Sequence, residues 1–69
     1  MPIRDHYTEM APQAKNREKF DRMVTFFRNA KTRDDLKTCT MMFVMDMNYE
    51  RSDIMLALGV VEREKGWHV

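Results

Sequence analysis

The stretch from Thr38 to Met47, TCTMMFVMDM, constrains the possible fold more than any other part of the chain. No charged residue occurs between Thr38 and Met45, although charged residues make up 33% of the sequence. On a helix, where successive residues are about 100° apart, this stretch is apolar on two faces. One face carries Leu36, Cys39, Phe43 and Met47 with Thr40 among them, and the other carries Met41, Met42 and Met45.

A helix that is apolar on every side is normally buried on every side. A chain of 69 residues has too little material to surround one helix, and its core is marginal without further support. We therefore expect a second copy of the chain, or a partner protein, to cover this helix. The sequence predicts a homodimer whose interface includes it.

The eight methionines of the chain fall into two groups in this interpretation. Methionine is flexible and polarizable, so it suits irregular gaps in a core as well as surfaces that adapt to more than one partner. We interpret Met23 and Met47 as core residues. We interpret Met41, Met45 and Met55 as interface residues.

Composition indicates one ordered helical domain over residues 1–69, with only two Gly and two Pro and 43% apolar residues. The 12 basic and 11 acidic residues leave a net charge of +1, without the basic face of a nucleic-acid binder, so we expect no nucleic-acid partner. No stretch approaches the ~20 apolar residues of a membrane span. The N-terminus lacks the apolar core of a signal peptide, and a single cysteine excludes an internal disulfide. The sequence thus predicts a soluble, cytoplasmic protein with no membrane partner.

Residues 1–11 are predicted to form an N-terminal arm. One possibility is that its first few residues are disordered. The other is that Ile3, Tyr7 and Met10 pack on a neighbouring surface. A first helix is predicted from near Pro12 to Asn29–Lys31, because proline is tolerated in a first helical turn. Phe26 falls at the edge of its apolar stripe, where it faces either solvent or an interface. The stripe, at helical spacing, is Phe20, Met23, Val24, Phe27 and Ala30.

A second helix is predicted from about Arg33 to Met47. Thr32 is a suitable N-cap, with Asp35 at the position of the acid in a capping box. The short connection makes the two helices an antiparallel pair. Asn48 is predicted as a left-handed C-cap, and Tyr49 belongs to the following turn.

The C-terminal segment has two interpretations. The string from Asn48 to Val60, NYERSDIMLALGV, resembles the middle of a helix-turn-helix, most closely that of the LuxR-type response regulators. In that family an acid–Ile pair such as Asp53-Ile54 lies in a helix, and Leu-Gly-Val makes the tight turn. Pieces of the tail, Glu62-Arg63 and His68-Val69, also match the recognition helix. The resemblance implies a corner at Gly59.

Several residues depart from that family pattern. Val61 stands where a Ser or Thr N-cap is expected, and Gly66 would lie inside the recognition helix. The other interpretation, which we favour, is one helix from about Ser52 to Lys65, with Ser52 as N-cap and Gly66 after the last turn. Its inner side would be Ile54, Ala57, Leu58 and Val61; its outer side would be Arg51, Met55, Glu62 and Arg63; and Trp67 would fold back onto the domain.

No residue pattern indicates catalysis, a metal site or a cofactor. His6 and His68 lie at opposite ends of the chain, and Cys39 has neither of them nearby in sequence. No Gly-rich phosphate loop, HExxH or GxSxG occurs. We interpret Cys39 as a small core residue.

The predicted fold is therefore all-α: a three-helix small domain, made of an antiparallel helix hairpin and a C-terminal helix, that forms a homodimer. A chain this small, with adhesive helices and no catalytic residues, resembles the host-takeover inhibitors encoded by bacteriophages. Among these, the inhibitors of host transcription activators, including quorum-sensing regulators of the LuxR type, fit the C-terminal resemblance. The resemblance implies a steric inhibitor in the host cytoplasm, and not an enzyme. The residues predicted to bind a second copy or a partner are Phe26, Met41, Met42, Met45, Tyr49, Arg51, Met55 and Trp67.

The alternative is a DNA-binding transcriptional regulator that uses residues 49–69 as a truncated helix-turn-helix. A basic patch in three dimensions and steeply salt-dependent DNA binding would favour it.

Overall fold

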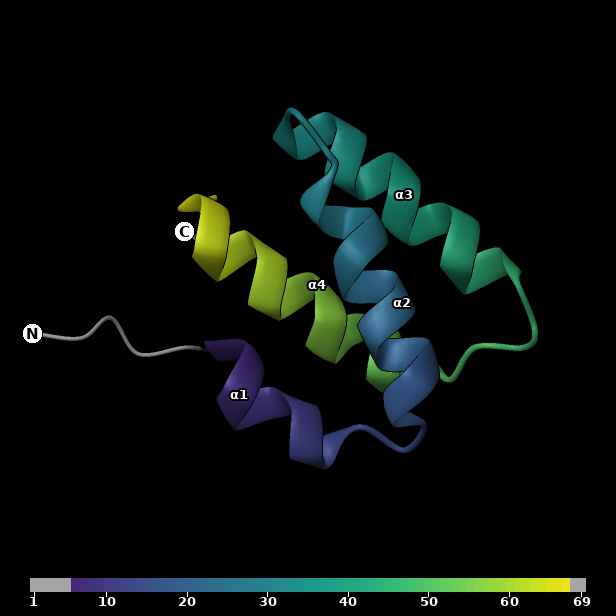
Figure 1. The fold of residues 1–69 in the computed structure, drawn as a ribbon. Helices are drawn as coiled ribbons and strands as arrows, with labels where there is room; N and C mark the ends of the chain where they lie inside the picture. The colour runs from purple at the N-terminus through teal and green to yellow at the C-terminus, as the bar shows by residue number, and fades with distance from the viewer. Residues whose placement is uncertain (1–5, 68–69) are drawn as a thin grey trace, which may run out of the picture.

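The computed structural model describes residues 6–67, and every regular element within this range is a helix (Figure 1). The elements are α1 (His6–Met10), a 3-10 turn η1 (Ala11–Gln13), α2 (Arg17–Arg28), α3 (Arg33–Met45) and α4 (Arg51–Lys65). The all-α prediction is confirmed, and α1 is a helix additional to the three predicted. Ile3, His68 and Val69 lie outside the described residues. No helix in the described range is both long and apolar enough to cross a membrane.

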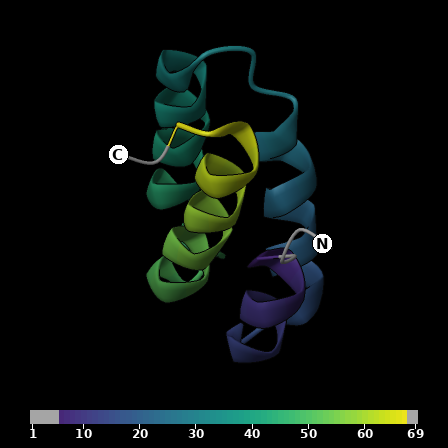
Figure 2. The same ribbon diagram turned by 90° about the vertical axis from the view of Figure 1, so that its left-hand side faces the viewer.

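Helix α4 is the central element of the fold. It contacts α1, α2 and α3, and its contact with α2 is the most extensive between any two helices. Figure 2 shows α4 between α3 and α1. The predicted antiparallel pair of α2 and α3 is present, but α3 packs at the edge of the domain (Figure 1).

The core forms where α2 faces α4. The predicted stripe of the first long helix is confirmed, because Phe20, Met23 and Phe27 are fully buried. On α4, Val60 is buried and the predicted Leu58 is only half-buried. Because α4 packs against α1, α2 and α3, Val60 is enclosed in the core, whereas Leu58 lies at the edge of the core. The remaining buried apolar residues are Ala11, Val24, Ala30, Leu36, Ile54, Ala57 and Val61.

Residues 6–16, which precede α2, are folded onto the domain. Tyr7 of α1 stacks on Phe20 with ring centroids 5.8 Å apart, and Met10 also packs against the core. Residues 6–10 of the predicted arm are thus a packed helix, too short to be recognised by periodicity. Pro12 lies in η1, and α2 begins later than predicted because Asn16 caps it, accepting the Lys19 N–H at 3.0 Å.

Helix α3 begins as predicted and ends early. Thr32 caps its N-terminus by accepting the Asp35 N–H at 3.1 Å, which confirms the predicted cap. The C-cap is Asp46, whose carboxylate accepts the Asn48 N–H at 2.9 Å. This local turn ends the helix without a left-handed residue, so the prediction for Asn48 was wrong. Met47 falls in the turn and is 99% exposed, so its assignment to the core was also wrong.

Helix α4 runs without interruption from Arg51 to Lys65. Gly59 lies inside it, and Gly66 is the only described residue with a positive φ, at 72°. The continuous helix is confirmed, except that Glu50 and not Ser52 is its N-cap. Trp67 folds back as expected, since its N–H donates to the Glu62 carbonyl at 2.9 Å and its side chain packs against the core.

Candidate protein-binding surface

The outer side of α3 carries three of the six large hydrophobic side chains that are exposed among the described residues. Only Leu36 of this helix is buried. Met41, Met42 and Met45 are 59%, 57% and 77% exposed, and we call these three residues the methionine face. Each i, i+3 or i+4 step along a helix returns to nearly the same side, which is why the three side chains share one surface. The sequence prediction that they lie opposite Leu36 and Phe43 is confirmed.

An aromatic cluster holds the inner side of α3. The Phe43 ring makes edge contacts with Phe26, Phe27 and Tyr49 at centroid distances of 5.4, 5.4 and 4.8 Å. Arg22 donates to the Tyr49 hydroxyl at 3.5 Å, and this hydrogen bond raises the pKa of Arg22 above its ordinary value. Tyr49, predicted to bind a partner, is therefore half-buried in contacts with its own chain.

Two hollows run along α3, one on each side. The hollow between α3 and α4 has a volume of about 310 Å³, and the one between α2 and α3 about 290 Å³. Met41 forms part of the wall of the first, opposite Leu58. Phe26, 42% exposed, lines the second together with Cys39. Helix α3 thus lies between two grooves.

The other predicted binding residues do not join the methionine face into one patch. Met55 is 57% exposed on α4 and lines a third hollow, between α1 and α4, of about 340 Å³. Leu58 lines both this hollow and the α3–α4 groove, which Met41 lines as well. Arg51 and Trp67 lie at opposite ends of α4.

Sequence reasoning missed Leu58 as a surface residue because helical spacing alone placed it on the inner side of α4. No role was predicted for the two charged residues that border the methionine face. Lys37 lies at one end of the uncharged stretch and Asp46 at the other. Their position in the sequence, on either side of that stretch, was the signal that could have identified them.

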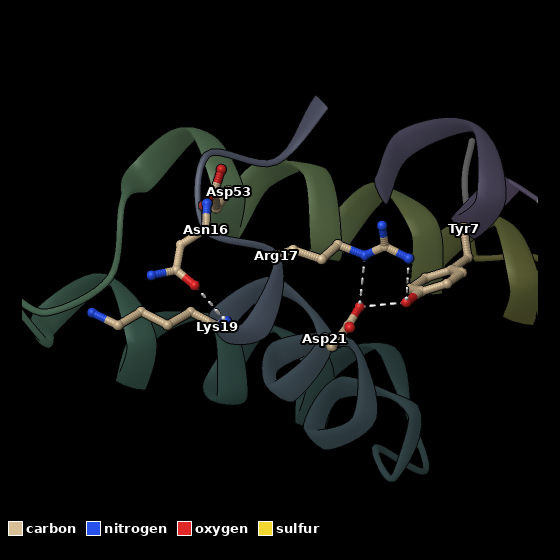
Figure 3. A network of polar contacts seen from close by, with 6 residues as sticks. All are labelled: Tyr7, Asn16, Arg17, Lys19, Asp21 and Asp53. Atoms are coloured by element: carbon tan, nitrogen blue, oxygen red, sulfur yellow. Dashed lines mark hydrogen bonds and ion pairs between the residues drawn. The ribbon is translucent and has the colours of Figure 1, made fainter. Parts of the chain in front are cut away.

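Figure 3 shows a network of polar contacts that holds helices of the domain together. The buried carboxylate of Asp53 accepts the backbone N–H groups of Lys15 and Asn16 at 2.8 and 3.0 Å. Nearby, the Tyr7 hydroxyl donates to Asp21, and Arg17 contacts both. The hydrogen bond that Arg17 donates to the Tyr7 hydroxyl raises the pKa of Arg17 above its ordinary value. These contacts attach α1 and the turn after it to α2 and α4.

Among residues 6–67 no three His, Cys, Asp or Glu side chains are grouped so that they could hold a metal ion. Cys39, predicted to be a core residue, is half-buried at the edge of the α2–α3 groove. His6 faces Glu9 at 3.8 Å on the same short helix.

Comparison of the chain with protein-family models, curated proteins and solved structures finds no match.

Proposed function

We propose that this protein acts by binding other proteins through the outer side of α3, and that one of these partners is a second copy of itself. The observation that carries the proposal is the exposure of Met41, Met42 and Met45 on a helix with a single buried residue. A side chain of this size gains about 1.5–3 kcal/mol when it moves from water into a fully apolar contact. Burial of these three methionines therefore contributes favourably to association.

The shape of the surface supports this function. Contiguous apolar patches on small domains mark interaction sites more often than isolated exposed residues do. The methionine face is bordered by grooves and by charged side chains, which is the usual arrangement of an apolar centre and a polar rim. Methionine also allows one surface to adapt to different partners.

The mechanism we propose is steric: the bound protein covers a functional surface of its partner, and no bond is made or broken. The resemblance in size and composition to phage-encoded inhibitors makes a host transcription activator of the LuxR type the first partner to test. Such an inhibitor would cover the activator's DNA-binding or assembly surface.

The regulator alternative depends on a corner at Gly59. Helix α4 continues through that residue without a positive φ, so residues 51–65 do not form the two short helices that DNA reading requires. We therefore do not propose that this segment reads DNA.

The experiment is a competition assay with a purified LuxR-type activator bound to its operator DNA. Added wild-type protein should release the activator. The variant Met41→Glu/Met45→Glu should fail to do so, because it places two charges in the apolar contact. The matched control is Met47→Glu, at a residue that is 99% exposed and outside α3, and it should act like the wild type. Equal release by the double variant would contradict the role of the methionine face, and no release by the wild type would exclude this partner.

A further inference from the structure

The outer side of α3 carries two rows of side chains. Residues four apart on a helix lie one above the other, so Lys37, Met41 and Met45 form one row. Thr38 and Met42 form the second row, and Asp46 follows it at the helix end. Within residues 37–46 of this surface, charge occurs only at the two ends, with Lys37 at the N-terminal end and Asp46 at the C-terminal end; Arg33 and Asp34 continue the two rows one turn before it.

Neither terminal charge is neutralised within residues 6–67. Lys37 and Asp46 take part in none of the ion pairs of this range. One oxygen of Asp46 accepts the Asn48 N–H, which leaves its second oxygen for another donor. Lys37 is exposed and lines the α3–α4 groove.

We propose that a second copy of this chain pairs with α3 in the antiparallel direction, so that Lys37 of each copy lies beside Asp46 of the other. This register places Met41 opposite the partner's Met42, and Met45 opposite the partner's Thr38. Both ends then hold unlike charges, and every residue between them is uncharged. A parallel pairing would instead place Lys37 against the partner's Lys37.

The inference rests on the proposed self-association and adds its direction and register. Exposed ion pairs contribute little affinity, so the methionines supply most of the binding. The charges decide between the two directions, because like charges in contact disfavour the wrong arrangement. The contact is symmetric, as a two-fold dimer requires.

The test is a charge-reversal series measured by sedimentation equilibrium. Lys37→Glu and Asp46→Lys should each weaken the dimer about tenfold or more, equivalent to about 1.4 kcal/mol, because each places like charges at both ends. The double variant Lys37→Glu/Asp46→Lys should regain the wild-type dimer constant to within about threefold. An equimolar mixture of the two single variants should form a heterodimer, since both of its ends again hold unlike charges.

Two controls separate the contact from the fold. Arg63→Glu makes the same charge change on α4, at a residue that lines the α1–α4 hollow, and should leave the dimer constant unchanged. Asp46→Asn keeps an oxygen for the Asn48 N–H but removes the charge, and should weaken the dimer by about threefold. Circular dichroism of each variant should show the helix content of the wild type.

A zero-length carbodiimide cross-link gives an independent measure of register. Within one chain, Lys37 and Asp46 are about 14 Å apart along the helix axis, too far for such a link. A link between them in the dimer band supports the proposed register, and a dimer without this link overturns it. A dimer unaffected by the charge reversals also overturns the register but leaves the proposed self-association intact. A wild type that stays monomeric overturns both.

Discussion

The backbone N–H of Asn16 donates to the carboxylate of Asp53, although the two residues are 37 positions apart in the chain. Asp53 is 1% exposed and accepts the Lys15 N–H as well, so both of its oxygens are occupied. It also lies in the first turn of α4, where a negative charge is favourable. One buried carboxylate therefore attaches the segment just before α2 to the central helix α4.

Replacing Asp53 with Ala should lower the free energy of unfolding by about 2–4 kcal/mol. Hydrogen bonds to a charged group are worth about 1.5–3 kcal/mol, and the substitution leaves two backbone donors without an acceptor. Asp53→Asn should also destabilise the protein, because one end of an amide cannot accept. Urea denaturation measures both changes.

The control for this site is Asp34→Ala, at an exposed acid in the first turn of α3. It removes a favourable helix-dipole interaction of about 0.3–1 kcal/mol and no buried hydrogen bond. A loss at Asp53 no larger than the loss at Asp34 would show that the carboxylate does not hold the segment.

Gly59→Ala should stabilise the protein by up to about 1 kcal/mol. Glycine inside a helix is less favourable than alanine by about this amount. A Cβ at Gly59 would meet no atom within 4 Å, so the gain is not cancelled by a clash. Thermal denaturation of the variant measures the change.

Gly66→Ala should have the opposite effect on stability and is the comparison for Gly59→Ala. Its φ of 72° is strained for alanine, so this variant should lose about 1 kcal/mol. A destabilised Gly59→Ala variant would contradict the continuous α4.

Leu36→Ala should cost about 2–5 kcal/mol, the usual range for truncating a buried leucine. Leu36 is 1% exposed and is the only buried residue of α3, so its loss should loosen this helix before the others. Hydrogen exchange should show the greatest loss of protection in residues 33–45. Met47→Ala, at a residue that is 99% exposed, should change stability by less than about 0.5 kcal/mol.

Periodicity and caps predicted much of this fold. The apolar spacing from Phe20 to Ala30 predicted the buried side of α2, and Thr32 with Asp35 predicted the start of α3. The two-faced pattern around Phe43 also predicted that the methionines would be left uncovered by a single chain. These features are local, since each depends on residues within a few helical turns.

The features that were not predicted depend on contacts between distant residues. Helix α1 is five residues long and too short to show a period, and it is held by the stacking of Tyr7 on Phe20. The attachment of Asn16 to Asp53 has no local sequence signal. Met47 was assigned to the core because the helix was extended past Asp46, whose turn with Asn48 ends it.

The methionine face on α3 is the surface through which we propose that this protein binds its partners. Sedimentation equilibrium of the wild type, Met41→Glu/Met45→Glu and Met47→Glu at high micromolar concentration tests this proposal most directly. We expect a dimer for the wild type and for Met47→Glu. For the double variant we expect a folded monomer, because Met41 and Met45 are already 59% and 77% exposed in the single chain and their replacement disturbs no core contact. A wild type that sediments as one chain, or a double variant that dimerises equally well, would contradict the proposal.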